Sequence, residues 1–427
     1  YYKKLLHTDT LTQIPNKQYF MKTAEKILDN NSDKSYLLTS LDARNFKLIN
    51  ERFGHIVGDQ TLMNIAKNIK SKFHKNGLYA RSQGDSFLIL VEDTSQNREL
   101  LKSLVDLDIS IHNTTNYKVP LKIGVCPIPR YNPALSLSLY IDRANIAKKY
   151  TSARNTNYIC YFTDDMNKKL NMKNMIESEM VRALSKGEFV VYYQPKYELA
   201  NDTIIGAEAL VRWNHKEKGI ISPGVFIPVF ERNGFIVDLD FYVYEQVLKM
   251  QKHRLDMGKK VIPISMNVSR CHLSDTNFVD KLEAVVAKYK VPKQYIEMEI
   301  TESIFSQEDS SAIALIYNLK EHGFTISMDD FGSAYSSLNL LRKVQIDTLK
   351  IDKVFIDSTE DVQRSQVIVE EIINMASKIH VKTICEGVET QSQRDFLKNA
   401  GCNMVQGYFY SKPLPYEDFS DLLNSSK

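Results

Sequence analysis

A strand, a helix and a second strand follow one another in VIPISMNVSRCHLSDTNFVDKLEAVVAKYKVPKQYIEMEI, residues 261–300. The two ends are short and apolar, whereas apolar residues recur every three or four positions in residues 278–289, a helical spacing. The first strand-like segment ends on Asn267, and the second contains Glu299 close to its end. The pattern predicts parallel strands that present polar side chains at their carboxyl ends.

The same pattern runs through the second half of the chain. Helical spacing fills most of the gaps, as in residues 241–255 and 362–379. Eight strand–helix repeats predict a closed (β/α)8 barrel, whose active sites lie at the carboxyl ends of the strands. Eight short apolar segments each carry a side chain able to bind a metal, a proton or a phosphate near their ends: residues 189–194 (Gln194), 204–210 (Glu208), 261–267 (Asn267), 295–300 (Glu299), 324–330 (Asp329 and Asp330), 347–352 (Lys350), 382–387 (Glu386) and 404–409 (Gln406).

One gap in this series is too short for a helix. Only residues 195–207 lie between Gln194 and Glu208, and AND at residues 200–202 is turn-like. Parallel neighbours need a crossover of a dozen or more residues. We therefore expect the first two strands to form an antiparallel hairpin, so that the barrel begins with a reversed strand.

Composition limits the class of protein. A chain of 427 residues with 43% apolar and 25% charged residues is typical of globular material with about two or three domains. A formal net charge of +3 does not favour a DNA or RNA partner. Five widely spaced cysteines without CxxC spacing indicate reduced thiols. Nothing resembles a signal peptide or a membrane-length apolar run, so we expect a cytoplasmic protein. Because the sequence starts at Tyr1 within an apparent helix, an upstream sensor or membrane segment stays open.

The sequence divides into two differently organised halves. We expect a first domain at residues 1–162, with strand-like residues 36–43, 86–93 and 121–128 and helical residues 60–73 and 139–150, a pattern typical of an α/β or α+β domain. The polar residues 163–173 are predicted to be a linker. Residues 174–427 have the length of a barrel domain.

The motifs of the second half identify a family. They resemble those of the EAL phosphodiesterases, and the likeness of the whole chain is to a tandem GGDEF and EAL protein of cyclic di-GMP signalling. The matching segments are YYQP (192–195), EALVRW (208–213), SMNVS (265–269), EITES (299–303), DDFGSAYSSL (329–338), LKID (349–352), CEGVET (385–390) and QGYFYSKPL (406–414). One departure is Ala334, where the family usually has glycine; if the position needs a positive φ, a Cβ costs about 1 kcal/mol there.

The first half resembles a GGDEF domain with a degenerate signature. The resemblance rests on residues 9–20, 46–62 and 81–87, and QGDSF at residues 83–87 stands where the family has GGDEF. Gln83 would crowd the path of a phosphate, and Arg44 replaces a usual acid, so cyclase activity is disfavoured. The resemblance still implies a GTP site made of metal-binding carboxylates, a guanine-binding pair and a phosphate-contacting lysine: Asp42 and Asp85, Asn50 and Asp59, and Lys149. The alternative is that Asn50 caps a turn and Asp59 begins a helix.

The residues at the strand ends suit hard divalent cations. Their oxygen donors, without cysteine or histidine, favour Mg2+ or Mn2+ over structural zinc. Crowded carboxylates would repel one another unless cations lay between them, and two ions sharing Asp329 would satisfy this. The family resemblance implies a first ion held by Glu208, Asn267, Glu299 and Asp329, and a second held by Asp329, Asp330 and Glu386.

Further roles follow from the chemistry and the resemblance. Lys350 is expected to orient or deprotonate the attacking water, or to offset charge on the phosphate. The resemblance implies that Glu302 orders the loop after the fifth strand and that Glu389 supports the ligands. We assign Glu208 and Glu386 to catalysis with Lys350 and Glu302. The expected substrate-binding side chains are Gln194, Arg212, whose planar fork suits a phosphate, Gln406 and Glu389.

These residues predict a phosphodiester hydrolase, because two close ions can activate water for displacement at phosphorus. The resemblance makes the substrate cyclic di-GMP and the product linear pGpG, with a first domain that binds GTP and regulates the barrel, and with a homodimer by analogy. Two alternatives stay open: a cyclic di-GMP receptor without hydrolysis, and a diguanylate cyclase. Each site residue alone has an ordinary reading as a solvated or capping group; their occurrence at eight strand ends favours a site.

Overall fold

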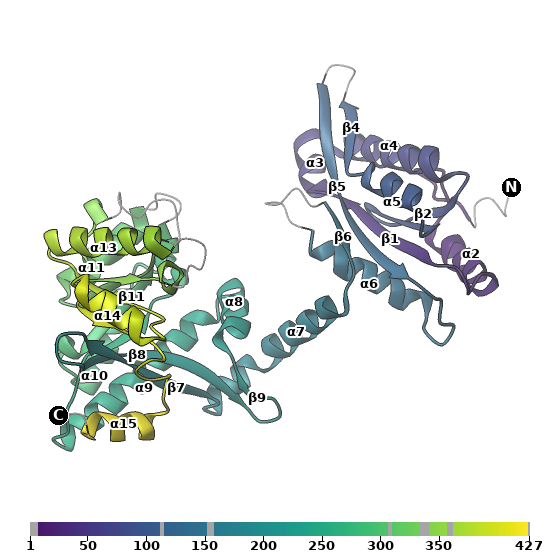
Figure 1. The fold of residues 1–427 in the computed structure, drawn as a ribbon. Coiled ribbons are helices and arrows are strands. Elements are labelled where there is room, and N and C mark those ends of the chain that lie inside the picture. Colours follow the sequence, from purple (N-terminus) through teal and green to yellow (C-terminus); the bar gives the residue numbers. More distant parts are fainter. Residues whose placement is uncertain are drawn as a thin grey trace. The chain divides into compact units, whose positions relative to one another are not determined.

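The computed structural model describes residues 7–111, 115–151, 158–305, 310–332, 341–356 and 362–425. The chain divides into two compact units, Tyr1–Met172 and Lys173–Lys427 (Figure 1). Residues 164–173 of the predicted linker lie in one long helix, α7 (Asp164–Ser185), which contains the boundary between the units. Among the described residues, no helix is long and apolar enough to span a membrane.

The first unit is built on a sheet of six strands in the order β2-β3-β1-β5-β4, with β6 paired to β5. The central strand β1 is antiparallel to both of its neighbours, β3 and β5. The three strands predicted from the sequence correspond to β1, β3 and β5, whereas β2, β4 and β6 were not predicted. The strands are β1 (Tyr36–Ala43), β2 (Gly77–Gln83), β3 (Ser86–Glu92), β4 (Asp106–Ile111), β5 (Thr115–Ile128) and β6 (Ile159–Tyr161).

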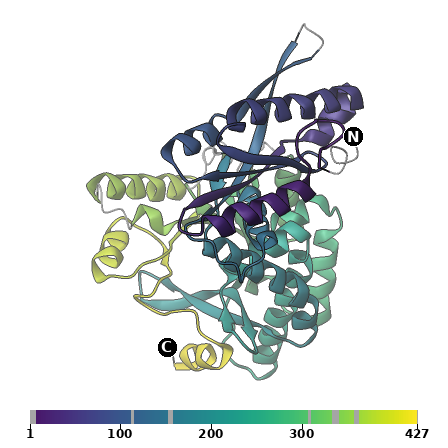
Figure 2. The same cartoon turned by 90° about the vertical axis from the view of Figure 1, so that its right-hand side faces the viewer.

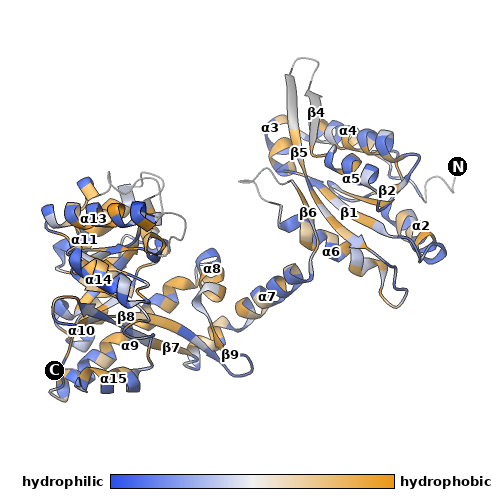
Figure 3. Ribbon diagram, in the orientation of Figure 1, coloured by the Kyte–Doolittle hydropathy of each residue, from blue (hydrophilic) through white to orange (hydrophobic). Residues whose placement is uncertain are grey.

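Apolar side chains on both faces of this sheet explain why helices cover it on two sides. Alternate residues of β1 point to opposite faces, so Leu37 and Leu41 join one core cluster, with Ile65 of α4, and Leu38 joins the other, with Phe20 of α2. Orange, apolar stretches occur along the strands of this sheet and on the helices in the hydropathy colouring (Figure 3). The helices are α2 (Lys17–Asn30), α3 (Phe46–Phe53), α4 (His55–Phe73), α5 (Ser95–Lys102) and α6 (Leu137–Lys149).

The second unit is a barrel of eight strands with one reversed strand. The strands pair in the order β10-β11-β12-β13-β14-β15-β7-β8, and β10 pairs with β8 to close the ring. Strand β9 pairs with the carboxyl-terminal end of β8. Strand β7 is antiparallel to β8 and to β15, and the pairings among β8 and β10–β15 are parallel. The predicted hairpin and barrel are confirmed. The strands are β7 (Phe189–Glu198), β8 (Thr203–His215), β9 (Gly219–Ile221), β10 (Ile264–Asn267), β11 (Ile296–Thr301), β12 (Thr325–Phe331), β13 (Thr348–Ile351), β14 (Lys382–Cys385) and β15 (Met404–Val405).

Helices surround the barrel because each has one apolar stripe to bury. In α10, for example, Val279, Leu282 and Val286 are spaced by three and four residues and are all buried in the barrel's core cluster. The helices lie outside the strands in both views (Figures 1 and 2). They are α8 (Pro223–Asn233), α9 (Ile236–Asp256), α10 (Phe278–Tyr289), α11 (Ser310–Glu321), α13 (Val362–Lys378), α14 (Gln391–Asn399) and α15 (Tyr416–Ser425).

Candidate active site

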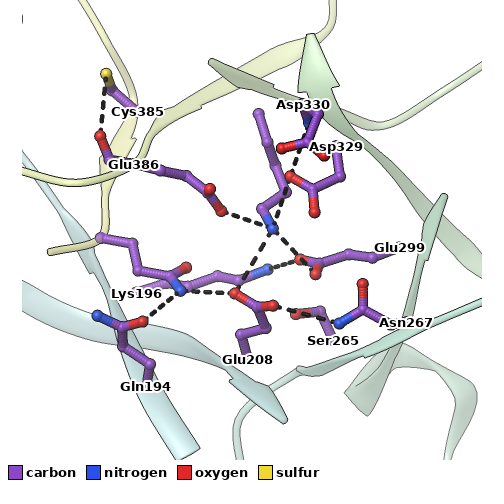
Figure 4. A network of polar contacts seen from close by, with 12 residues as sticks. Gln194, Lys196, Glu208, Ser265, Asn267, Glu299, Asp329, Asp330, Cys385 and Glu386 are labelled. Atoms are coloured by element: carbon purple, nitrogen blue, oxygen red, sulfur yellow. Dashed lines mark hydrogen bonds and ion pairs between the residues drawn. The ribbon is translucent and has the colours of Figure 1, made fainter. Parts of the chain in front are cut away.

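Four carboxylates and one ammonium group meet at the carboxyl ends of the barrel strands. They come from β8, β11, β12, β13 and the residue that follows β14, and the carboxylates point toward one another (Figure 4). The Nζ atom of Lys350 lies 2.7 Å from Glu386 Oε1, 3.0 Å from Glu299 Oε2, 3.1 Å from Asp329 Oδ1 and 3.6 Å from Glu208 Oε2. The structure therefore brings five of the predicted site residues to a single point.

This cluster is buried, which strengthens its electrostatic interactions. Lys350 is 1% exposed, and Glu299 is fully buried. Burial alone lowers the pKa of Lys350, but the surrounding carboxylates outweigh it and hold the pKa well above its ordinary value. The ammonium group is thus charged, and it offsets the repulsion among the acids around it.

Two amide side chains donate hydrogen bonds to Glu208, and a third amide side chain accepts from one of them. Gln406 Nε2 donates to Glu208 Oε2 at 2.7 Å and to Gln194 Oε1 at 3.0 Å. Asn267 Nδ2 donates to the other oxygen, Oε1, at 3.3 Å. Gln194 is the register partner of Glu208 across the antiparallel hairpin, so the reversed strand brings it to the site. Three more predicted residues therefore belong to the same constellation.

The two buried glutamates have opposite electrostatic environments. Burial and then the neighbouring Glu299 raise the pKa of Glu208 to about 8. Burial also acts to raise the pKa of Glu299, but Lys196 and Lys350 outweigh it and lower that pKa to about 2. Before a cation binds, the surroundings thus favour the charged form of Glu299 and disfavour the charged form of Glu208.

Lys196 is a functional candidate that the sequence reasoning missed. It extends from β7, is 3% exposed, and its Nζ donates to Glu299 Oε1 at 2.9 Å and to Glu297 Oε1 at 3.3 Å. The available signal was its position two residues after Gln194, because side chains two apart on a strand face the same side. A lysine in an apolar strand that points into a barrel needs an acidic partner.

Asp329 and Asp330 take different positions. Asp330 has a left-handed backbone, φ +57°, and its N–H donates to Asp329 Oδ1 at 2.9 Å. Burial, followed by the negative charges of Asp329 and Asp352, raises the pKa of Asp330 to about 6. Asp329 therefore contacts Lys350 directly, and Asp330 joins the cluster through its backbone.

The other predicted barrel residues lie farther out. Glu302 is buried, and its Oε2 accepts the N–H of Gly332 at 2.9 Å, which ties the segment after β11 to the end of β12. Arg212 lies over the ring of Tyr192, 5.8 Å from the centroid, and Glu389 is exposed; in the described part of the chain, no contact joins either side chain to the carboxylates. Position 334 lies outside the described residues.

The donor set fits divalent cations in chemistry. Glu208, Glu299, Asp329 and Glu386 offer hard oxygen ligands of the kind that Mg2+ and Mn2+ prefer, and they converge on one cationic centre. That centre is the ammonium of Lys350, and no group of three Asp, Glu, His or Cys side chains within the described ranges is arranged around a place for an ion. A divalent ion would thus compete with Lys350 for the same oxygens.

In the first unit, the segment QGDSF (83–87) forms the turn of the β2–β3 hairpin. Gly84 has φ +61°, and Arg81 donates from Nη2 to the Gly84 carbonyl at 2.8 Å, which braces the turn. Asp42 on β1 forms a 2.6 Å ion pair with Lys148. Burial, and then the charge of Asp42, raise the pKa of Asp85. The two predicted carboxylates are therefore close enough to interact, and one of them already has a cationic partner.

The predicted guanine-binding pair lies where α3 meets α4. The side chain of Asn50 packs against Gly58, since a Cβ added to Gly58 would be 1.9 Å from Asn50 Oδ1. Asp59, the residue after Gly58, is exposed. Lys149 is exposed near the end of α6, whereas its neighbour Lys148 points to Asp42 and Ser40. Of these two lysines of α6, Lys148 is the one bonded to a predicted carboxylate, Asp42.

Comparison with known proteins gives two family matches. The EAL domain family matches residues 177–413, and the family described as "Diguanylate cyclase, GGDEF domain" matches residues 6–156. The bifunctional diguanylate cyclase/cyclic di-GMP phosphodiesterase MucR of Pseudomonas aeruginosa is 28% identical over 415 residues, 96% of this chain and 60% of that protein. The cyclic di-GMP phosphodiesterase NbdA of the same species is 30% identical over 99% of this chain and 54% of its own length.

A solved structure also resembles the barrel. The MucR phosphodiesterase in complex with cyclic di-GMP is 32% identical, with a TM-score of 0.55, and the match covers 57% of this chain and 99% of that one. The chain itself spans between half and two thirds of the length of the curated relatives it matches.

Proposed function

The chain belongs to the EAL domain family as a tandem GGDEF and EAL protein of cyclic di-GMP signalling, and we propose that its barrel hydrolyses cyclic di-GMP to linear pGpG with divalent cations. The functional division we propose is a regulatory domain at residues 1–162, a linker at 163–173 and a catalytic barrel at 174–427. The proposal includes a homodimer, which sedimentation equilibrium of the purified protein tests.

The observation that carries the proposal is the convergence of four carboxylates from different strands on Lys350 Nζ, all within 3.6 Å. Burying such a group of acids without cations lowers the stability of the fold, because each charge loses its hydration. A purely structural role would therefore be unfavourable. Acidic side chains with shifted pKa values, grouped with a charged lysine at the carboxyl ends of the barrel strands, favour an active site.

The residues would divide the work as follows. Glu208, Asn267, Glu299, Asp329, Asp330 and Glu386 would hold two Mg2+ or Mn2+ ions. When bound, these ions lower the pKa of the attacking water and neutralise charge on the phosphate. Glu302 keeps the end of β12 in place through Gly332.

Lys350 would act at the reacting phosphate. Its ammonium group is charged and held by acids on several sides, so once ions take over those acids it is free to donate to the attacking water or to a phosphate oxygen. Gln406 and Gln194 form a hydrogen-bonded pair beside Glu208 and would orient water or a guanine edge. Arg212, which lies four residues beyond Glu208, would bind a phosphate oxygen, and Glu389 would support the metal ligands.

The test is turnover by the purified chain. Cyclic di-GMP is incubated with Mg2+ or Mn2+ and the nucleotides are separated by chromatography; the expected product is pGpG. The matched variant Glu208→Gln keeps the shape of the side chain and removes its charge, and it should abolish hydrolysis. Retention of cyclic di-GMP without any product would support the receptor alternative, and conversion of GTP to cyclic di-GMP would support the cyclase alternative.

We also propose that the first domain binds GTP without turning it over and adjusts the activity of the barrel. The degenerate signature supports this, because Gln83 replaces a glycine and Ser86 an acid. So does the Asp42–Lys148 ion pair, since it leaves Asp42 less available as a metal ligand. Asn50 and Asp59, adjacent where α3 meets α4, would read the guanine edge, and Lys149 would contact a phosphate.

Calorimetric titration with GTP tests this regulatory role, together with rates of cyclic di-GMP hydrolysis with and without GTP. Asp59→Asn should weaken GTP binding, and Asp29→Asn, an exposed acid on α2, serves as the control that should not. Absence of GTP binding, or binding with no change in rate, would remove the regulatory role.

A further inference from the structure

Lys196 crosses the interior of the barrel. It starts on β7, and its ammonium group reaches β11, although β8 and β10 lie between these strands in the sheet. Its register partner on β8 is Gly206, where an added Cβ would lie 3.2 Å from the Pro263 carbonyl oxygen and 3.7 Å from Lys196 Cδ. A glycine there leaves room for the lysine stem, so the strand opposite Lys196 is shaped to let it pass.

The two buried lysines hold different oxygens of the same glutamate. Lys196 Nζ lies 2.9 Å from Glu299 Oε1, and Lys350 Nζ lies 3.0 Å from Glu299 Oε2. Only the second oxygen faces the group shared with Asp329 and Glu386. Because a carboxylate can rotate about its terminal torsion, a fixed donor on one oxygen determines where the other points.

Building on the proposed phosphodiesterase function, we propose that Lys196 is a positioning residue for metal binding. It anchors Glu299 Oε1 in the barrel interior, so that Oε2 is presented to the cation site in a fixed orientation. Residues that orient a ligand from behind typically change metal affinity by about tenfold to a hundredfold when removed. Lys196 would do so without contacting the substrate or the ions.

A structural role alone does not account for this arrangement. Filling a barrel interior requires only apolar volume, and replacing a buried ion pair by apolar residues is often neutral for stability. The ammonium of Lys196 instead contacts two glutamates, and Glu297, 9% exposed, balances the charge that Glu299 leaves when it serves the site. Glu297 thus offers a background in which Lys196 can be neutralised without changing the net charge of the interior.

The experiment compares three full-length proteins after removal of metal with a chelator. Glu297→Gln is the control, since it retains the bond between Lys196 and Glu299. The test variant, Lys196→Met/Glu297→Gln, removes one positive and one negative charge together. Calorimetric titration with Mn2+ alone gives the affinity, and thermal unfolding without metal reports whether the fold is kept.

We expect Glu297→Gln to bind Mn2+ much as the parent chain does, and the double variant to bind at least about fivefold more weakly, a loss of ~1 kcal/mol. The Mn2+ concentration for half-maximal hydrolysis should rise by a similar factor, with a smaller change in kcat at saturating Mn2+. A folded double variant with a smaller loss of affinity would overturn the positioning role.

Two further outcomes are informative. If Lys196→Met/Glu297→Gln does not fold, Lys196→Gln/Glu297→Gln replaces it, and failure of both would show that Lys196 serves the fold and reject the positioning role. If the parent chain binds Mn2+ but does not hydrolyse cyclic di-GMP, the proposed function fails while the affinity comparison still decides the role of Lys196. A parent chain that binds no Mn2+ overturns both.

Discussion

Replacing Lys350 by methionine separates two roles of its ammonium group, as the counter-ion of the metal-free site and as a participant in hydrolysis. The substitution keeps an unbranched side chain one atom shorter than lysine and removes the ammonium group that, among the described residues, lies within 3.6 Å of Glu208, Glu299, Asp329 and Glu386 together. Without metal, these acids then lose the cation that they share. Lys196 remains bonded to Glu299 but to none of the other three in the described structure.

The expected size of the effect follows from burial. Lys350 is 1% exposed, and removing one partner of a buried ion pair typically costs about 3–5 kcal/mol. For a unit of the barrel's size, 1 kcal/mol corresponds to ~2–4 °C in Tm. Metal-free Lys350→Met should therefore unfold about 6–20 °C below the parent chain.

Added Mn2+ should stabilise the Lys350→Met variant more than it stabilises the parent chain. In the parent chain the ion must compete with the Lys350 ammonium group for four carboxylates, whereas in Lys350→Met that competition is removed. The increase in Tm on addition of saturating Mn2+ should thus be larger for the variant than for the parent, since tighter binding to the folded state gives a larger shift. Hydrolysis should nevertheless be lost, because the proposed mechanism places the ammonium group at the reacting phosphate.

The Tm of each protein is measured by thermal unfolding, first with chelator and then with Mn2+. Lys378→Met serves as the control, because Lys378 is an exposed lysine at the end of α13. This control substitution should change Tm by no more than about 2 °C, which is within the range of ordinary surface substitutions. It should leave the increase in Tm on addition of Mn2+ unchanged. A metal-free Lys350→Met protein as stable as this control, or one with a smaller Mn2+ response than the parent, would refute the counter-ion role.

Three further predictions concern the barrel. Burial raises the folded-state pKa of Glu208 from 4.5 to about 8, so its contribution to metal-free stability is lost as the pH rises between these two values; Tm measured in chelator from pH 5 to 8 should fall less in Glu208→Gln. Arg394→Ala, which removes the bond from α14 to Asp202 in the β7–β8 turn, should lower the free energy of unfolding by about 1–3 kcal/mol in denaturant titrations and leave kcat unchanged. Gly387→Ala places a Cβ 2.4 Å from Lys353 Cβ at φ +68°, so steady-state assays should show a reduced kcat as the neighbouring catalytic acid is displaced.

The barrel could be predicted from the sequence because its signals are strong and repeated. Each of the eight strands has a short apolar run, and the hairpin followed from a gap too short for a crossover helix. The elements that were missed lack such signals: β6 has three residues, and β2, GLYARSQ, has an exposed or half-buried pattern with a single buried residue, Ala80. Strand β2 forms because β3 offers an antiparallel partner, which only the fold reveals.

The convergence of the candidate site was predictable to a similar extent. Parallel strands place their carboxyl ends at one rim, so Glu208, Glu299, Asp329 and Glu386 had to approach one another. The position of Arg212 was not, since its guanidinium group lies over the ring of Tyr192 and no described contact joins it to the acids. Neither was the left-handed backbone of Asp330, because aspartate adopts both left- and right-handed conformations and local sequence does not choose between them.

Lys196 escaped prediction for a topological reason that also explains its function. In a parallel strand, a residue two positions after the site residue lies farther out, toward the open rim, where a lysine would be solvated. Because β7 runs in the opposite direction, the residue two positions after Gln194 lies deeper, opposite Gly206, which precedes Glu208 on β8. The reversed strand therefore has a second effect besides closing the ring. It places the lysine of the QPK sequence beneath the carboxylates, where in the described structure it pairs with Glu299 among the proposed ligands. A barrel with a parallel first strand could not supply a cation at that depth from the same position.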